Sequence, residues 1–335
     1  MTQASLSREP KSYQLSAAGL HITFLDYGAC LVDIRLDGHL HPLIIGFQNP
    51  ADYMRDTEHL GAIAGPVANR ISGGQAMLDG RSFRLEKNEV ALDNHLHSGP
   101  AGLGKRFWEL EEIDAKSATL SCTLKKGETG LPGNRHFQVS YSITAYGQLD
   151  IEMRATTDRP SLCNMLTHPY FNLDGHRDVR HHHLQILADE ITEVSPKNVP
   201  TGVILPVENT IYNFQNPKPV LPFIDGTHPP LDQNYCISRA KQTELQKMAC
   251  LSSDQSLAML EIWSDQPGLQ CYLGQGLGST DAGLDLNGQA MRAFAGLCLE
   301  PQCWPDAPNR PDFPSIRFDA DHPYSQHSRF IFQLR

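Results

Sequence analysis

Residues 118–153 read ATLSCTLKKGETGLPGNRHFQVSYSITAYGQLDIEM. Apolar and polar residues alternate along 118–124, again along 137–143, and a third time along 149–153. A period of two residues is typical of a β-strand with one buried face. Three such segments in succession, separated by glycine-containing loops, predict an antiparallel sheet.

The same pattern continues on both sides of this stretch. Short apolar segments alternate with Gly, Pro, Asn and Asp at 22–34, 77–85, 184–187, 203–207, 257–262 and 269–273. Asp79-Gly80 between two apolar pairs is a strong hairpin signal. Only 50–60 and 240–249 resemble helices, and neither has clear caps. With no linker or internal repeat, we expect an all-β protein in which residues 1–335 form one domain, a large antiparallel β-sandwich.

Charge and cysteine content exclude several classes of function. Lys and Arg number 28 against 38 Asp and Glu, a net charge of −10 without any basic run. This argues against a nucleic-acid or membrane partner, and no long apolar segment or signal peptide is apparent. The eight cysteines contain no CxxC pair, which is typical of reduced, mostly buried thiols. We therefore expect a cytoplasmic protein.

A proline-rich stretch near the C-terminus carries a candidate catalytic carboxylate. Residues 296–315 read GLCLEPQCWPDAPNRPDFPS. Because a residue before proline is pushed toward extended geometry, Glu300 is expected at a strand end with a fixed direction. A carboxylate held still beside apolar residues is a candidate general base, and a solvated surface glutamate is the alternative.

Two polar groups in the first hundred residues are candidate ligand contacts. Asn69 and Arg70 interrupt the apolar stretch GPVANRIS at 65–72. Arg70 is suited to a substrate hydroxyl or a partner carboxylate, and a structural ion pair is the alternative. His95 and His97 would share one face of a strand, a spacing that suits a metal or a hydrogen-bonding pair; the pattern offers no third ligand near by.

Two further groups lie in the second half of the chain. His168 is held by Pro169 among aromatic residues in LTHPYFNLDG, so it is a candidate general acid, and a purely structural histidine is the alternative. Asp232, at the start of an apolar segment, can accept hydrogen bonds from two sugar hydroxyls or simply cap a turn. The run 181–183, HHH, is expected to be solvated rather than metal-binding.

These motifs, taken together and in this order, resemble the galactose mutarotase (aldose 1-epimerase) family. The resemblance is carried by YGACLVDIRL, GAIAGPVANRISGG, DGRSFRLEKNE with NHLHSG, LTHPYFNLDG, LDQNYCI, PGLQCYLGQ and LEPQCWPDAPNRPDFPS, which span residues 27–315. It implies a β-supersandwich and an isomerase, a mutarotase of carbohydrate metabolism that interconverts the α and β anomers of a free hexose such as galactose or glucose.

The resemblance also implies roles for individual residues. Glu300 becomes the general base and His168 the general acid. The sugar-binding residues it implies are Asn69, Arg70, His97, Asp232 and Gln270. No cofactor and no metal are expected, and the partner is a small free aldose bound by a monomer or homodimer.

The chain departs from the family pattern at two places. Pro66 stands where the family usually has an arginine, and Pro169 where it usually has a serine. Neither position is one of the implied catalytic residues, and Pro169 adjoins His168. A non-catalytic sugar-binding module and an epimerase of phosphorylated hexoses remain alternatives, whereas a glycoside hydrolase would need a second well-placed carboxylate.

Overall fold

The structure is a computed structural model that describes residues 8–278 and 283–335. Within these two ranges the chain is built of strands, and no α-helix occurs. The helical turns are short 3-10 helices, η2 (Pro50–Met54), η3 (Val90–Leu92), η4 (Gly99–Ala101), η5 (Leu103–Lys105), η6 (Glu128–Gly130), η7 (Leu221–Phe223) and η8 (Ala307–Asn309). The prediction of an all-β fold is confirmed.

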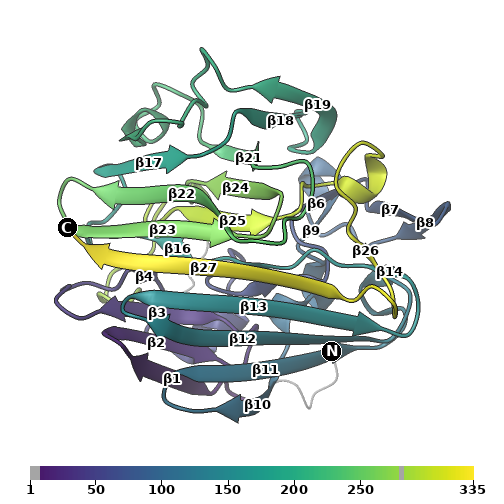
Figure 1. The fold of residues 1–335 in the computed structure, drawn as a ribbon, viewed down its shortest axis with the longest axis horizontal. Coiled ribbons are helices and arrows are strands. Elements are labelled where there is room, and N and C mark those ends of the chain that lie inside the picture. Colours follow the sequence, from purple (N-terminus) through teal and green to yellow (C-terminus); the bar gives the residue numbers. More distant parts are fainter. Residues whose placement is uncertain (1–7, 279–282) are drawn as a thin grey trace.

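One large antiparallel sheet spans the molecule (Figure 1). In spatial order its strands, as far as the chain is described, are β10 (Glu109–Ile113), β11 (Ser117–Leu124), β12 (Arg135–Ala145), β13 (Gln148–Thr157), β27 (Tyr324–Leu334), β23 (Ala258–Ser264), β22 (Gln246–Ser253), β17 (His182–Ile186) and β20 (Lys218–Pro219). The C-terminal strand β27 thus joins the two halves of the chain, because it pairs with β13 on one side and β23 on the other.

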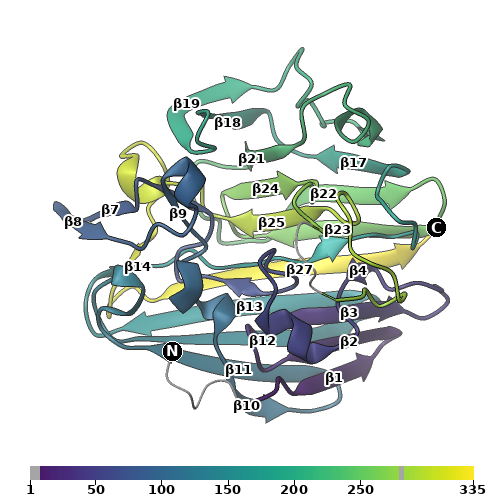
Figure 2. The same cartoon turned by 180° about the vertical axis from the view of Figure 1, so that it is seen from behind.

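Smaller sheets lie on one face of the large sheet, the face turned toward the viewer in Figure 2. The sheet that matters for function has the order β19 (Pro200–Pro206), β18 (Glu190–Val194), β21 (Asp232–Cys236), β24 (Gly268–Tyr272) and β25 (Cys298–Gln302). A second is formed by β1 (Ser12–Ala17), β2 (Leu20–Leu25) and β3 (Leu31–Leu36). The architecture is therefore sheet packed on sheet, as the strand pattern predicted.

Paired short strands complete the second layer. They are β14 (Ser161–Leu162) with β26 (Arg317–Phe318), β15 (Leu166–Thr167) with β5 (Ile63–Ala64), β16 (Tyr170–Phe171) with β4 (Ile44–Ile45), β6 (Arg70–Ser72) with β9 (Asn94–Leu96), and β7 (Gln75–Leu78) with β8 (Arg81–Arg84). Of these strands, β15 and β16 contact β25, and so bring distant parts of the sequence to one place.

The core lies between the layers and is made by the apolar faces of the alternating strands. Phe137, Val139 and Tyr141 of β12 are fully buried, as the period of two requires. Rings connect the layers: Phe24 of β2 lies 5.5 Å from Tyr141, and Phe171 of β16 lies 5.5 Å from Phe330 of β27, centroid to centroid. This packing holds the small sheets, and the residues on them, against a large rigid sheet.

Local sequence signals are confirmed in some segments and wrong in another. Asp79 and Gly80 have φ of 48° and 74°, the left-handed pair that a two-residue hairpin turn requires. The segment 50–60 contains only η2. The segment 240–249 forms no helix at all, because Gln246 and the residues after it enter β22 and pair with β17 and β23. Tertiary pairing overrides local helix propensity here.

No helix within the described ranges has the length and apolar character that a membrane crossing demands.

Candidate active site

A cavity of about 280 Å³ opens beside the second layer, where β21, β24 and β25 meet the loops that follow β5, β9 and β15. It is lined by Thr57, Glu58, His59, Asn69, Arg70, Glu89, Leu96, His97, His168, Tyr170, Asp232, Gln270, Tyr272, Gly276 and Glu300. Most of these side chains carry hydrogen-bonding groups. The cavity is therefore suited to a small polar molecule rather than an apolar one.

Strand register places Glu300 in this cavity. Glu300 of β25 pairs with Gln270 of β24, which pairs in turn with Asn234 of β21. Directly opposed residues share a face of the sheet, so the three side chains form a row. Glu300 lies in the middle of β25 rather than at its end, because the strand continues through Pro301 to Gln302. The prediction of a strand-end glutamate was wrong, but the fixed direction was correct.

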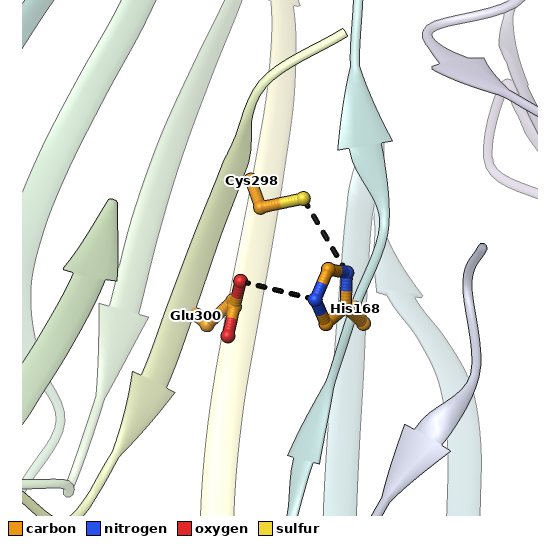
Figure 3. A group of neighbouring side chains, drawn as sticks. All are labelled: His168, Cys298 and Glu300. Atoms are coloured by element: carbon orange, nitrogen blue, oxygen red, sulfur yellow. Dashed lines mark hydrogen bonds and ion pairs between the residues drawn. The ribbon is translucent and has the colours of Figure 1, made fainter. Parts of the chain in front are cut away.

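His168 approaches Glu300 from the connection between β15 and β16. Its backbone is fixed on both sides, since its N–H donates to the Ala62 carbonyl at 3.0 Å and its carbonyl accepts from the Gly61 N–H at 2.9 Å. The imidazole Nε2 lies 3.4 Å from Glu300 Oε1. Its Nδ1 lies 3.4 Å from Cys298 Sγ, so the ring contacts both a carboxylate and a thiol of β25 (Figure 3).

Burial sets the charge of this pair. Glu300 is 2% exposed and His168 5%. Desolvation raises the pKa of the Glu300 carboxyl well above its usual value; nearby Asp232 adds to the rise and Arg70 opposes it. Desolvation also lowers the pKa of His168 to about 4. Both effects favour the neutral forms of the pair, a protonated carboxyl and an unprotonated imidazole.

Two further histidines form the wall next to His168. The ring centroid of His97 lies 5.4 Å from that of His168 and 4.8 Å from that of His59. Burial, and then the neighbouring imidazoles, lower the pKa of His97 well below its usual value. His97 Nδ1 accepts the backbone N–H of Asn69 at 3.2 Å. The neutral ring therefore carries its proton on Nε2 and acts there as a hydrogen-bond donor.

The expected pairing of His95 with His97 does not occur. Strand β9 ends at Leu96, and His97 follows it with φ of 50°. His95 Nδ1 instead lies 2.5 Å from the Glu86 carbonyl oxygen. Because His97 leaves the strand pattern while His95 stays within β9, the two side chains do not share a face, and only His97 lines the cavity.

Arg70 and two carboxylates form the opposite wall. The Arg70 guanidinium donates to both oxygens of Glu89 at 3.0–3.1 Å and to Asp232 Oδ2 at 3.2 Å. Asp232 Oδ1 also accepts from Gln270 Nε2 at 2.6 Å. Asp232 is thus held in place by a cation and an amide. Each of its oxygens keeps lone-pair capacity for a hydroxyl group in the cavity.

Asn69 connects this wall to the histidines. It adopts φ of 61°, and its side-chain oxygen accepts the Arg70 N–H at 2.8 Å. Asn69 Nδ2 lies 3.5 Å from Gln302 Oε1 on β25. A left-handed asparagine that bonds to its own neighbour is a common device for turning the chain. Here it directs Asn69 and Arg70 into the same cavity.

Comparison with known proteins bears on what such a cavity does. The sequence profile described as aldose 1-epimerase matches residues 11–330. The chain belongs to the aldose 1-epimerase family. It is 30% identical over 330 residues to galactose mutarotase of Rattus norvegicus, covering 97% of this chain and 94% of the relative. It is 32% identical over 306 residues to aldose 1-epimerase of Escherichia coli, covering 89% and 87%.

A solved structure agrees with the family assignment. The aldose epimerase homologue from C. elegans superimposes with a TM-score of 0.89 at 30% identity, covering 97% of this chain and 99% of that one. Members of this family are isomerases that act on sugars. The resemblance recognised in the sequence motifs is therefore confirmed, together with the mutarotase-like fold.

The cavity of this family member brings together every site residue that the motifs implied: Asn69, Arg70, His97, His168, Asp232, Gln270 and Glu300. Sequence reasoning missed His59, Glu89 and Tyr272, which also line it. It also missed Cys298, although Cys298 lies two residues before Glu300 and so shares its strand face. The histidines 181–183 lie elsewhere, on and beside β17.

Proposed function

We propose that this protein interconverts the α and β anomers of a free hexose such as galactose or glucose, with Glu300 as general base and His168 as general acid. The observation that carries the proposal is the contact of 3.4 Å between Glu300 Oε1 and His168 Nε2 inside a cavity lined by hydroxyl-binding side chains. A base and an acid so close together can serve the two oxygens bound to one anomeric carbon.

The reaction needs no other chemical group. Glu300 removes the proton from the anomeric hydroxyl while His168 protonates the ring oxygen, and the ring C–O bond breaks to give the open aldehyde. The aldehyde group rotates about its bond to the neighbouring carbon, and the reverse proton transfers then close the ring on the other face of the carbonyl. Each well-placed acid or base contributes roughly 10²–10⁴ in rate. The sugar gains and loses the same atoms, so no cofactor is consumed.

The proton count of the empty site fits this scheme. The working state requires an ionised Glu300 and a protonated His168, and the two groups together then hold one proton. The neutral pair that burial favours holds the same number. One transfer across the 3.4 Å contact converts one form into the other without any exchange with solvent.

The remaining side chains orient the sugar. Asn69, Arg70, His97, Asp232 and Gln270 present donors and acceptors around the cavity, and a neutral His97 donates through Nε2. The volume of the cavity, about 280 Å³, is close to the lower limit for small-molecule pockets, which span about 300–1,000 Å³. A monosaccharide suits this size better than an oligosaccharide.

The charges favour an unphosphorylated sugar. Arg70 is the one arginine or lysine among the cavity-lining residues of the described chain, and its guanidinium is already shared by Glu89 and Asp232. A phosphate group carries about two negative charges near neutral pH and is bound in proteins by available cations. Facing these carboxylates, it would be repelled. We therefore favour a free hexose over a hexose phosphate.

Pro66 and Pro169, the two departures from the family pattern, lie outside the cavity wall. Neither belongs to the described lining of the cavity. Pro169 adjoins His168, whose backbone is held by Ala62 and Gly61. We infer that the departures act on the approach of the sugar rather than on the acid and base.

Polarimetry tests the proposal directly. Purified protein should accelerate the optical-rotation change of fresh α-D-galactose or α-D-glucose well above the buffer rate, and α-D-glucose 6-phosphate should respond far less. A protein that binds these sugars in calorimetry but accelerates none of them would be a non-catalytic sugar-binding module. A preference for the phosphate ester would overturn the charge argument.

We further propose that residues 1–335 form one cytoplasmic domain that works as a monomer or homodimer. All eight cysteines are free thiols, which supports a reducing compartment. Size-exclusion chromatography with light scattering measures the assembly state.

A further inference from the structure

Three buried side chains in the candidate active site converge as a set of metal-ligating atoms. His168, Cys298 and Glu300 each offer one ligand atom, and these atoms lie within 4.8 Å of one another. Cys298 and Glu300 project from the same face of β25, and His168 faces both from the neighbouring segment (Figure 3). No other group of three such residues meets this spacing in the part of the chain that the structure describes.

We propose that His168, Cys298 and Glu300 bind a divalent cation of the zinc class, and that the bound ion blocks the isomerase. A thiolate, an imidazole and a carboxylate are the three ligand types that Zn²⁺ takes in proteins. A thiolate excludes Mg²⁺ and Ca²⁺, which prefer oxygen ligands. The fourth position of a tetrahedral ion would face the cavity, where a water molecule or a sugar hydroxyl can occupy it.

The spacing is close to what zinc needs. With Zn–S of about 2.3 Å and Zn–N and Zn–O of about 2.0–2.2 Å, ligand atoms of a tetrahedral site lie about 3.3–3.6 Å apart. Both contacts of the His168 ring measure 3.4 Å, but they use its two different nitrogens. A metal takes only one of them, so the third ligand atom has to close in by about 1 Å from the 4.8 Å limit. A side-chain rotation supplies such a movement.

Charge balance favours a divalent ion in this buried position. The three ligand residues are buried, and with protonated Cys298 and Glu300 and an unprotonated His168 they carry no net charge. A divalent cation with one thiolate, one carboxylate and one neutral imidazole is neutral as well. Binding releases the thiol proton and the proton shared by Glu300 and His168, and no electron is transferred.

The ion can enter through the cavity. His168 and Glu300 line it, and the carboxylates of Asp232 and Glu89 stand on the same surface. Once bound, the metal occupies the lone pairs that the proposed base and acid use, so metal and sugar compete. The inhibition rests on the proposed function, whereas the metal binding does not.

Cobalt absorption tests the binding without any enzyme assay. Co²⁺ titrated into EDTA-stripped protein should give one equivalent of sulfur-to-metal charge-transfer absorption. Cys298→Ser, which keeps the size of the side chain, should abolish that absorption, and so should Cys298→Ala. Cys250→Ser is the matched control, because Cys250 is a half-buried thiol on β22. Thermal melts establish that each variant is folded. Absorption that survives both Cys298 substitutions would overturn the site.

Zinc inhibition tests the consequence. Zn²⁺, but not Mg²⁺, should slow mutarotation reversibly, EDTA should restore the rate, and galactose should protect. Each protein's rate is normalised to its own rate in EDTA. Cys298→Ser should then raise the zinc concentration that gives half inhibition by at least about 10–100-fold, the loss of affinity typical when a residue that supports a metal site is removed. Equal zinc sensitivity in wild type and Cys298→Ser would refute the inhibition. Cobalt binding in a protein without mutarotase activity would keep the site and reject the proposed function.

Discussion

Glu300 and Asp306 are two buried carboxylates six positions apart in one proline-rich stretch, and their surroundings are opposite. Asp306 is 1% exposed and Glu300 2%. Asp306 accepts hydrogen bonds from the Ser72 N–H at 3.0 Å, Asn309 Nδ2 at 2.6 Å and Arg310 Nε at 3.1 Å. Among the described residues, no group donates such a bond to the Glu300 side chain, whose contact is His168 at 3.4 Å.

The difference separates a structural carboxylate, Asp306, from the proposed general base, Glu300. Desolvation raises the pKa of both carboxyls, but at Asp306 the hydrogen bonds and the Arg310 charge oppose the rise. At Glu300 the neighbouring Asp232 adds to it. A carboxylate whose oxygens already accept three fixed hydrogen bonds has little capacity left for a ligand proton, whereas one without such donors at a cavity can take a proton from a ligand. Burial alone therefore does not identify a general base.

The largest expected effect comes from Glu300→Gln. The substitution keeps the shape of the side chain and removes its basicity, so kcat should fall by about 10²–10⁴. Sugar binding should change little, because the hydroxyl-binding side chains remain. Polarimetry gives kcat and calorimetry the dissociation constant. A variant with nearly normal kcat would mean that another carboxylate is the base.

Asp306→Asn should act on stability instead. The amide loses an acceptor for at least one of the three donors around it, which costs about 1–3 kcal/mol at a buried position. The melting temperature should fall, while kcat of the folded enzyme changes by less than about tenfold. Thermal unfolding and polarimetry on the same preparation make the comparison. If Asp306→Asn abolishes turnover and Glu300→Gln only lowers the melting temperature, the two roles are reversed.

A third carboxylate sharpens the contrast and has the smallest expected effect. Asp150 on β13 accepts from Arg329 Nε at 2.8 Å and from Gln148 Nε2 at 3.0 Å, and His327 Nε2 lies 2.6 Å away. Burial acts to raise its pKa, but these bonds and one from Thr144 outweigh burial and hold the pKa well below its usual value. Its stabilising contribution is then complete above the unfolded-state pKa of about 3.9 and is lost as the pH falls through the lower folded-state pKa.

Asp150→Asn therefore should destabilise the protein at pH 7, by an amount that shrinks below about pH 4. Urea unfolding between pH 7 and pH 3 measures this difference. A constant or growing difference at acid pH would contradict the argument.

The sequence predicted the fold through local signals that tertiary structure reinforced. Alternation along β11, β12 and β13 and the Asp79-Gly80 turn gave strands and a hairpin at the right places. The helix prediction for 240–249 was wrong because strand pairing determines the structure of this segment, and the local sequence does not show the pairing partners. The seven implied site residues came from motifs whose order resembled a family. Spacing alone left alternatives open for residues such as Arg70, Asp232 and Glu300, and it did not single out Gln270.

Residues outside those motifs needed the coordinates. His59 follows η2 in a segment without any periodic pattern, and only the fold brings its ring to 4.8 Å from that of His97. Glu89 was missed because its role is to hold Arg70, a contact between positions 19 residues apart. The position of Cys298 on the same strand face as Glu300 could have been predicted from the sequence, because residues two apart on a strand share a face. The contact to His168, 130 residues away, could not have been.

The site has two parts that differ in their tolerance to insertions and deletions. One part is the row of Glu300, Gln270 and Asn234, which crosses β25, β24 and β21. One residue added within β25 ahead of Glu300 would turn Glu300 to the opposite face of the sheet and remove the proposed base from the cavity. The segments that carry His59 and Glu89 lie outside regular strands, and such segments accept changes of length. Laboratory evolution toward another sugar should therefore collect its changes in these two segments and leave the three strands intact.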